Sequence, residues 1–259
     1  MTSVKKLISR AYMKMILRRE YIFINKECNL KYLFIKKKRS NRMMIIFSGF
    51  PAKDQKSVYN YVLKFRDLRC NKLYILDDFG SDSRGSYYLG KNKNFFIERA
   101  VTQLIEKISN ENKIPKENIM TVGSSKGGFA ALYFAFKNGY GATISGAPQI
   151  LLGNYLSLPI HLDILNYITG GIDENEVECL NKILLNLIYS STVCPDLYLH
   201  VSEKEHHYEG HILHLLKALD SKNFKYNLDL ADYEIHGEVS KYFPEYARKS
   251  FQDLTSKSQ

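Results

Sequence analysis

The alternation of short apolar runs with helix-like stretches constrains the fold of this chain more than any other sequence feature. From residue 73 onward, strand-like runs are separated by stretches whose apolar residues recur at helical spacing. We expect strands at 73–76, 119–122, 142–144, 197–201 and 228–233, and helices at about 95–110, 126–137 and 210–219. Such alternation requires right-handed crossovers between parallel strands. The sequence therefore predicts an α/β protein with a mostly parallel sheet flanked by helices.

Three more strands precede this alternation. The runs 21–24 and 32–35 predict an antiparallel pair that leads to a third strand at 43–47, which brings the sheet to about eight strands. Residues 148–195 interrupt the rhythm with helical apolar spacing, and we interpret them as a helical cap inserted between strands. A chain of 259 residues with 45% hydrophobic content can bury one core, so we expect a single domain over 1–259.

The net charge of +10 is concentrated at the amino-terminal end. Residues 1–42 contain thirteen Lys and Arg against two acidic residues, so this segment carries +11 and the rest of the chain −1. A nucleic-acid groove would interleave basic and aromatic residues across its face, and we expect no nucleic-acid partner. Residues 1–20 predict a basic amphipathic helix. Such a helix suits peripheral contact with a membrane, packing on the body, or packing on a second subunit in a homo-oligomer.

The cysteines and the shortness of the apolar runs indicate the compartment. Cys28, Cys70, Cys179 and Cys194 form no C-x-x-C pair, so neither a disulfide scaffold nor a thiolate zinc site is predicted. No run approaches the roughly 18 apolar residues that span a bilayer, and the amino terminus lacks the pattern of a signal peptide. We expect a cytoplasmic protein, with any membrane contact at the cytoplasmic face of the inner membrane.

A strand, a G-x-S-x-G turn and a helix start follow one another over residues 119–128. In a nucleophile elbow of this kind the serine is strained, and the residues two before and two after it must be small. Ser125 has Gly123 and Gly127 at those positions, whereas Ser124 would have Val122 and Lys126. The pattern therefore predicts Ser125 as the nucleophile of an α/β-hydrolase fold.

Backbone amides near this elbow are the expected oxyanion donors. The amide of Lys126 lies at the predicted helix start, where it can stabilise a developing negative charge. The loop after the third strand contains Phe47-Ser48-Gly49-Phe50-Pro51 and is where this fold supplies a second donor. The amide of Gly49 or of Phe50 is the candidate.

The fold supplies its base and its acid after successive later strands. His236 is the only histidine beyond the strand 228–233 and is the predicted base. Glu203 and Glu205 both follow the strand 197–201, and periodicity alone does not separate them. Glu205 is preferred as the acid, since it lies a few residues beyond the strand end.

A group of histidines after this acid raises the question of a metal site. His207 and His211 stand at i, i+4, which could place two imidazoles on one helix face. No H-E-x-x-H motif accompanies them. We therefore predict no metal.

Residues 78–88 follow the strand 73–76, at the edge of the sheet where ligands bind. Arg84 can clamp an anionic group through its planar guanidinium, and Tyr87 is a second candidate for substrate contact. The alternative for Arg84 is an ion pair with a loop acid such as Asp82.

Several segments taken in order resemble the bacterial capsular polysaccharide O-acetyltransferases. They cover roughly residues 43–245 and include Phe47-Ser48-Gly49-Phe50-Pro51, Arg84-Gly85-Ser86-Tyr87-Tyr88, Gly123-Ser124-Ser125-Lys126-Gly127-Gly128 and Ala147-Pro148-Gln149. The resemblance implies an α/β-hydrolase fold, acetyl-CoA as donor, a polysaccharide hydroxyl as acceptor, and a triad of Ser125, His236 and Glu205. A member of that family carries Asp where this chain has Glu205, and residues 1–42 have no equally clear counterpart there.

These observations predict an O-acetyltransferase that works through an acetyl-serine and holds no permanently bound cofactor. A serine esterase acting on carbohydrate or small esters is the first alternative, because the triad itself does not distinguish transfer from hydrolysis. A non-catalytic subunit of a polysaccharide export or secretion complex is the second. A distance too large for contact between Ser125 and His236 would favour that last alternative.

Overall fold

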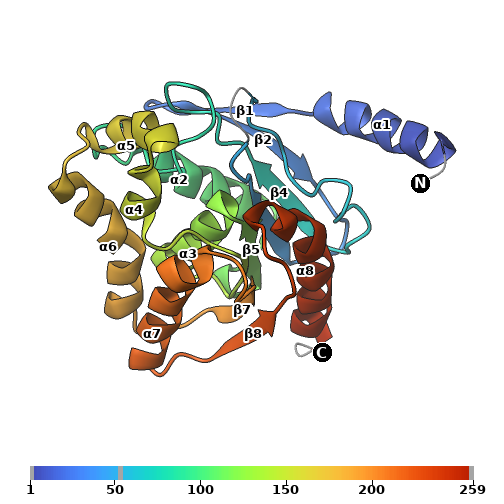
Figure 1. Cartoon of the computed structure of the whole chain (residues 1–259). Helices are drawn as coiled ribbons and strands as arrows, with labels where there is room; N and C mark the ends of the chain where they lie inside the picture. The colour runs from blue at the N-terminus through green and yellow to red at the C-terminus, as the bar shows by residue number, and fades with distance from the viewer. Residues whose placement is uncertain (1–2, 52–54, 257–259) are drawn as a thin grey trace.

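The computed structural model describes residues 3–51 and 55–256. The described part of the chain forms an eight-stranded sheet in the order β1-β2-β4-β3-β5-β6-β7-β8 (Figure 1). Its strands are β1 (Tyr21–Ile24), β2 (Asn29–Ile35), β3 (Met43–Phe47), β4 (Asn71–Ile75), β5 (Ile119–Ser124), β6 (Ala142–Gly146), β7 (Asp196–Val201) and β8 (Tyr226–Leu230). Strands β1 and β2 pair antiparallel, and every pair from β4 to β8 is parallel. The predicted antiparallel entry and parallel body are confirmed.

Helices cover both faces of the sheet, and the central strands are therefore buried on both sides. In β3, Met43 and Ile45 pack with α2 (Phe96–Glu111) and α3 (Lys126–Asn138). The alternate residues Met44 and Ile46 face α8 (Val239–Ser256), which lies on the opposite side of the sheet (Figure 1). A strand that is apolar at every position is typical of such a doubly covered parallel sheet.

The carboxyl-terminal part of the chain departs from the prediction in two ways. Strand β8 ends at Leu230 instead of 233, because it pairs with β7 only as far as Val201. Helix α8 was not predicted, although Phe243, Ala247 and Phe251 recur at four-residue spacing. Pro244 within that helix weakens its signal, since proline removes a backbone donor.

The residues predicted as a cap contain three α-helices between β6 and β7, namely α4 (Leu152–Leu156), α5 (Leu162–Thr169) and α6 (Glu174–Ser190), with a 3₁₀ turn (Pro159–His161) before α5. Leu180, Leu184 and Ile188 of α6 belong to the same buried cluster as α2 and α3. After β7, a π-helical turn (Tyr208–Ile212) leads into α7 (Leu213–Ser221), close to the predicted helix 210–219. Buried residues of α4 and α5 belong to the same cluster, so the inserted helices extend the core.

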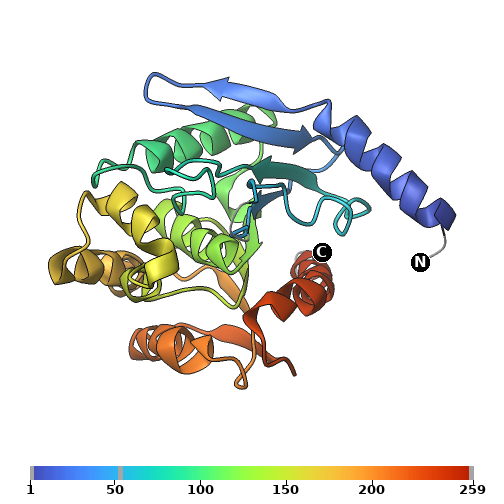
Figure 2. The same cartoon turned by 45° about the horizontal axis from the view of Figure 1, so that its top comes forward.

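Helix α1 (Ser3–Leu17) extends away from the sheet (Figures 1 and 2). Of its described side chains, Ile16 is buried on the α8 face of the sheet, whereas Leu7 and Ile8 are 69% and 58% exposed. The expected apolar stripe thus does not pack on the body along its length. The predicted contacts with a membrane or a second subunit stay predictions. No helix in the described ranges is long and apolar enough to cross a membrane.

A buried ion pair joins the elbow helix to the loop after β4. The Nζ of Lys126 lies 2.9 Å from Oδ2 of Asp77, and both side chains are fully buried. Asp77 also accepts hydrogen bonds from the amides of Ser86 and Tyr88, and Lys126 donates to the carbonyl of Arg84. Burial lowers the pKa of Lys126, although Asp77 opposes this shift. The pair therefore holds the loop 77–88 against the first turn of α3.

We expect Asp77→Asn to lower the free energy of unfolding by about 3–5 kcal/mol, because it leaves the buried ammonium of Lys126 without its counter-ion. Asp78→Asn is the matched control, since Asp78 pairs with the partly exposed Lys31 and its loss should cost less than about 1 kcal/mol. Urea unfolding of the two variants measures both values. Equal losses would contradict a special role for the buried pair.

Candidate active site

The turn between β5 and α3 has the strained geometry of a nucleophile elbow. Ser125 has φ 55° and ψ −123°, and α3 begins at the next residue. A Cβ on Gly123 would lie 2.2 Å from the carbonyl oxygen of Gly127, and a Cβ on Gly127 would lie 2.7 Å from that of Phe47. Both positions therefore require glycine, for the steric reason that the sequence indicated. Ser124 is buried and hydrogen-bonds instead with the hydroxyl of Tyr61.

Three side chains predicted from the sequence meet at the carboxyl ends of the strands. The Oγ of Ser125 lies 2.8 Å from Nε2 of His236, and Nδ1 of His236 lies 2.6 Å from Oε1 of Glu205. His236 follows β8 and Glu205 follows β7, so adjacent strand ends supply the two residues. The arrangement aligns a hydroxyl, an imidazole and a carboxylate in hydrogen-bond contact.

The two candidate acids occupy different environments. Glu205 is 3% exposed, whereas Glu203 is exposed and its nearest partner is the hydroxyl of Tyr208 at 3.4 Å. Burial alone would raise the pKa of the Glu205 carboxyl, but hydrogen bonds with His207 and His236 outweigh burial and lower it to about 2. Glu205 is thus held as a carboxylate beside the imidazole.

His207 is a second imidazole in contact with the same acid. Its Nδ1 lies 2.9 Å from Oε1 of Glu205 and 3.0 Å from Nδ1 of His236, and burial lowers its pKa. Glu205, His206 and His207 have ligand atoms within 4.8 Å of one another. A metal bound there would compete with His236 for Glu205. The other member of the i, i+4 pair, His211, accepts a hydrogen bond from the amide of Leu151, and burial lowers its pKa to about 3.

Gln149 is a site residue to which the sequence reasoning assigned no role. Its Nε2 donates to Oγ of Ser125 at 2.8 Å and lies 3.1 Å from Nε2 of His236. Its Oε1 is buried and has no hydrogen-bond partner among the described residues. The sequence feature that could have identified Gln149 is its position just after β6, at the edge of the sheet where ligands bind.

The predicted oxyanion donors differ in their availability. Lys126 is the first residue of α3, where backbone amides lack helical partners and point to the amino-terminal end of the helix. The amide of Gly49 already donates to Oδ1 of Asn60 at 2.7 Å. Phe50 is therefore the remaining candidate in its loop.

The two predicted substrate-contacting residues are both buried. The guanidinium of Arg84 forms an ion pair with Asp82, which was the alternative to an anion clamp. It also donates to the carbonyl of Ile160 at 3.1 Å and lies over the ring of Phe50. Tyr87 is fully buried against Phe50, and its hydroxyl has no hydrogen-bond partner in the described ranges. Arg84 lines a cavity of about 410 Å³ between its loop and the insertion, whereas Tyr87 is not among the described residues that line it.

The sheet order, the strained elbow and the converging side chains define the fold as an α/β-hydrolase. No family model matches the chain, and no curated protein matches it. Among solved structures it is similar to the capsule O-acetyltransferase of Neisseria meningitidis serogroup A, with a TM-score of 0.76 and 24% identity over 89% of this chain and 93% of that one.

Two further structures support the same fold. A mutant of the meningococcal enzyme in complex with CoA gives a TM-score of 0.74 and 22% identity, covering 90% of this chain and 94% of that one. An S-formylglutathione hydrolase from Agrobacterium tumefaciens gives 0.66 and 12% identity, covering 90% and 94%. At these identities the likeness shows the fold.

The low pKa of Glu205 predicts a pH-dependent contribution to stability. The folded-state pKa of the Glu205 carboxyl, about 2, lies below the ordinary value of 4.5. The carboxylate therefore stabilises the fold fully at pH values above 4.5, and this contribution is lost as the pH falls through about 2. We expect Glu205→Gln to lower the free energy of unfolding at about pH 6, and the deficit to shrink at about pH 3. Urea titrations measure it, with Glu203→Gln as control. A deficit that grows on acidification would contradict this account.

Proposed function

We propose that this protein is an O-acetyltransferase that moves an acetyl group from acetyl-CoA to a hydroxyl of a capsular or other surface polysaccharide. The observation that carries the proposal is the 2.8 Å contact between Ser125 Oγ and His236 Nε2 at a strained elbow. The similarity to an O-acetyltransferase whose structure holds CoA supports acetyl-CoA as the donor.

In the first half-reaction His236 accepts the proton of Ser125 as Oγ attacks the thioester carbonyl carbon. The negative charge that develops on the carbonyl oxygen is stabilised by the amides of Lys126 and Phe50. The C–S bond then breaks, His236 returns its proton to the CoA thiolate, and an acetyl-serine is left. Glu205 orients the imidazole and stabilises its cation.

In the second half-reaction a sugar hydroxyl replaces the thiol. His236 accepts its proton, the hydroxyl oxygen attacks the acetyl carbon, and the bond to Ser125 Oγ breaks as that oxygen regains a proton. If water entered instead, the same steps would make the enzyme an esterase.

Intact-protein mass spectrometry after mixing with acetyl-CoA tests the proposal. The wild type should gain the mass of one acetyl group, and Ser125→Ala should gain none while keeping its melting temperature within a few degrees. Ser124→Ala is the matched control, because that neighbour faces Tyr61 and should leave acetylation intact. Turnover of small esters without an acetyl adduct from acetyl-CoA would favour the esterase instead. An adduct that persists in Ser125→Ala would remove this residue from the mechanism.

The acid is tested by a second pair of variants. Glu205→Gln should lower the rate of acetyl transfer by about 10²-fold or more, the order expected when the residue that orients the imidazole is lost. Glu203→Gln should cost much less, because that side chain is exposed and accepts a hydrogen bond of 3.4 Å from Tyr208, away from His236. Steady-state rates and circular dichroism of both proteins provide the comparison. The opposite ranking in folded proteins would assign the acid to Glu203.

A further inference from the structure

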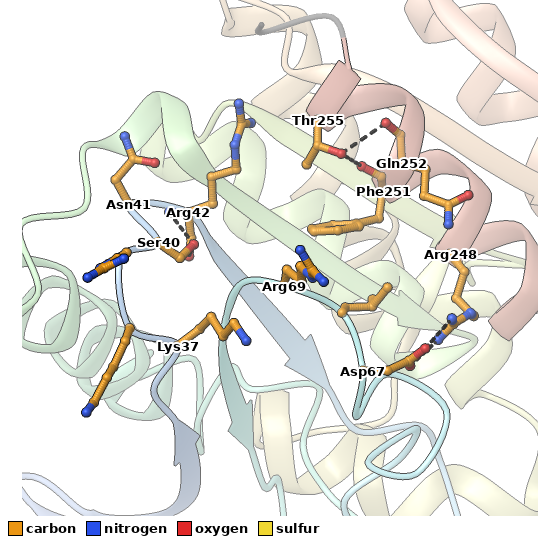
Figure 3. A pocket seen from close by; sticks show the side chains of 13 residues that line it. Lys37, Ser40, Asn41, Arg42, Asp67, Arg69, Arg248, Phe251, Gln252 and Thr255 are labelled. Carbon is orange, nitrogen blue, oxygen red and sulfur yellow. Dashed lines mark hydrogen bonds and ion pairs between the residues drawn. The ribbon is translucent and has the colours of Figure 1, made fainter.

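A basic pocket of about 610 Å³ lies at the opposite edge of the sheet from Ser125. It is formed by the loop before β3, the turn before β4 and the carboxyl-terminal part of α8 (Figure 3). Ser125 follows the carboxyl end of β5, whereas this pocket lies at the amino ends of β3 and β4. The pocket is thus separate from the candidate active site. Its lining contains six cationic side chains: Lys37, Lys38, Arg39, Arg42, Arg69 and Arg248.

The positive charge of this pocket is not balanced by protein groups. Among the described residues of the lining, Asp67 is the one acidic residue, and its two oxygens accept hydrogen bonds from the guanidinium of Arg248 at 2.6 and 2.7 Å. The other five cations form no ion pair within residues 3–51 and 55–256. Cations gathered around a cavity repel one another unless an anion enters, so the pocket attracts negatively charged ligands.

The loop that carries four of these cations is held in place by a buried amide. Asn71 is 1% exposed, its Nδ2 donates to the carbonyls of Ser40 and Arg42 at 2.9 Å each, and its Oδ1 accepts from the amide of Lys37 at 2.9 Å. Arg39 within the loop adopts a left-handed conformation with φ 61°. The backbone is therefore ordered before any ligand arrives, which reduces the entropic cost of binding.

The remaining lining favours a sugar chain over other polyanions. Ser40, Asn41, Gln252 and Thr255 offer hydroxyl and amide groups between the cations (Figure 3). Among the described lining residues, the apolar Leu68 and Phe251 are only 7% and 6% exposed, which leaves little aromatic face for stacking bases and little apolar side chain for insertion into a bilayer. The five cations without ion-pair partners in the described structure can serve more than one anionic group.

We propose that this pocket binds a segment of an acidic polysaccharide that carries several phosphate or carboxylate groups. Cations contact the charged groups, and the neutral polar side chains contact sugar hydroxyls. That this polymer is the acetyl acceptor rests on the proposed function. Docking at a second site raises the effective concentration of acceptor hydroxyls near Ser125, provided that the polymer is long enough to reach around the sheet.

Titration calorimetry with a short oligogalacturonate tests the pocket without any turnover. The test variant combines Lys37→Gln, Lys38→Gln and Arg39→Gln, three exposed side chains without ion-pair partners in the described structure. The matched control removes the same charge elsewhere through Lys116→Gln, Lys217→Gln and Lys225→Gln, which are also exposed. The wild type should bind the acidic oligosaccharide in a salt-sensitive way and ignore a neutral maltooligosaccharide. The test variant should bind about tenfold more weakly or worse, and the control should resemble the wild type.

Three results would overturn the proposal. These are no binding by the wild type, equal weakening in the test and control variants, and binding of the neutral sugar as tightly as the acidic one. Tighter, variant-sensitive binding of single-stranded DNA or of phosphatidylglycerol vesicles would reassign the pocket to that partner. Absence of an acetyl adduct on Ser125 would contradict the proposed function alone, because the titration requires no catalysis.

Discussion

The close approach of α3 to strand β5 is the constraint on which the rest of the site depends. It is possible only because Gly123 and Gly127 have no Cβ, and it forces Ser125 into a left-handed φ that a serine does not adopt without support. The strain directs Oγ out of the sheet edge toward His236. A buried sheet that is covered on both faces supplies the packing that keeps this conformation in place.

Two buried charge clusters stabilise the surroundings of the elbow. The ion pair between Lys126 and Asp77 fixes the loop after β4 beneath the first turn of α3, so one residue contributes its amide to the oxyanion site and its side chain to the scaffold. Glu205 is hydrogen-bonded to both His207 and His236, which keeps the carboxylate ionised, while burial lowers the pKa of the His207 imidazole against the opposing effect of Glu205. The first cluster is fully buried and the second largely so, and their order therefore depends on complete pairing of their polar groups.

Sequence patterns predicted about eight strands, an antiparallel entry and a mostly parallel sheet, because binary patterning and turn residues are local signals. The predicted elbow and its neighbours Gly123 and Gly127 likewise follow from a local steric rule. Gln149, His207 and the partnership of Lys126 with Asp77 depend on contacts between residues distant in sequence, which no local pattern specifies. The engagement of the Gly49 amide by Asn60 is of the same kind. Helix α8 was missed because Pro244 and its many polar residues obscure a regular apolar spacing.

Labelling with a fluorophosphonate tests the central claim most directly, because such a reagent reacts with a serine only when an adjacent base activates it. Peptide mapping of the wild type should find a single adduct on Ser125, and His236→Ala should lose it while Gln149→Ala keeps it. An adduct on Ser124, or labelling of Ser125 that does not depend on His236, would contradict the account of this site as an activated nucleophile elbow.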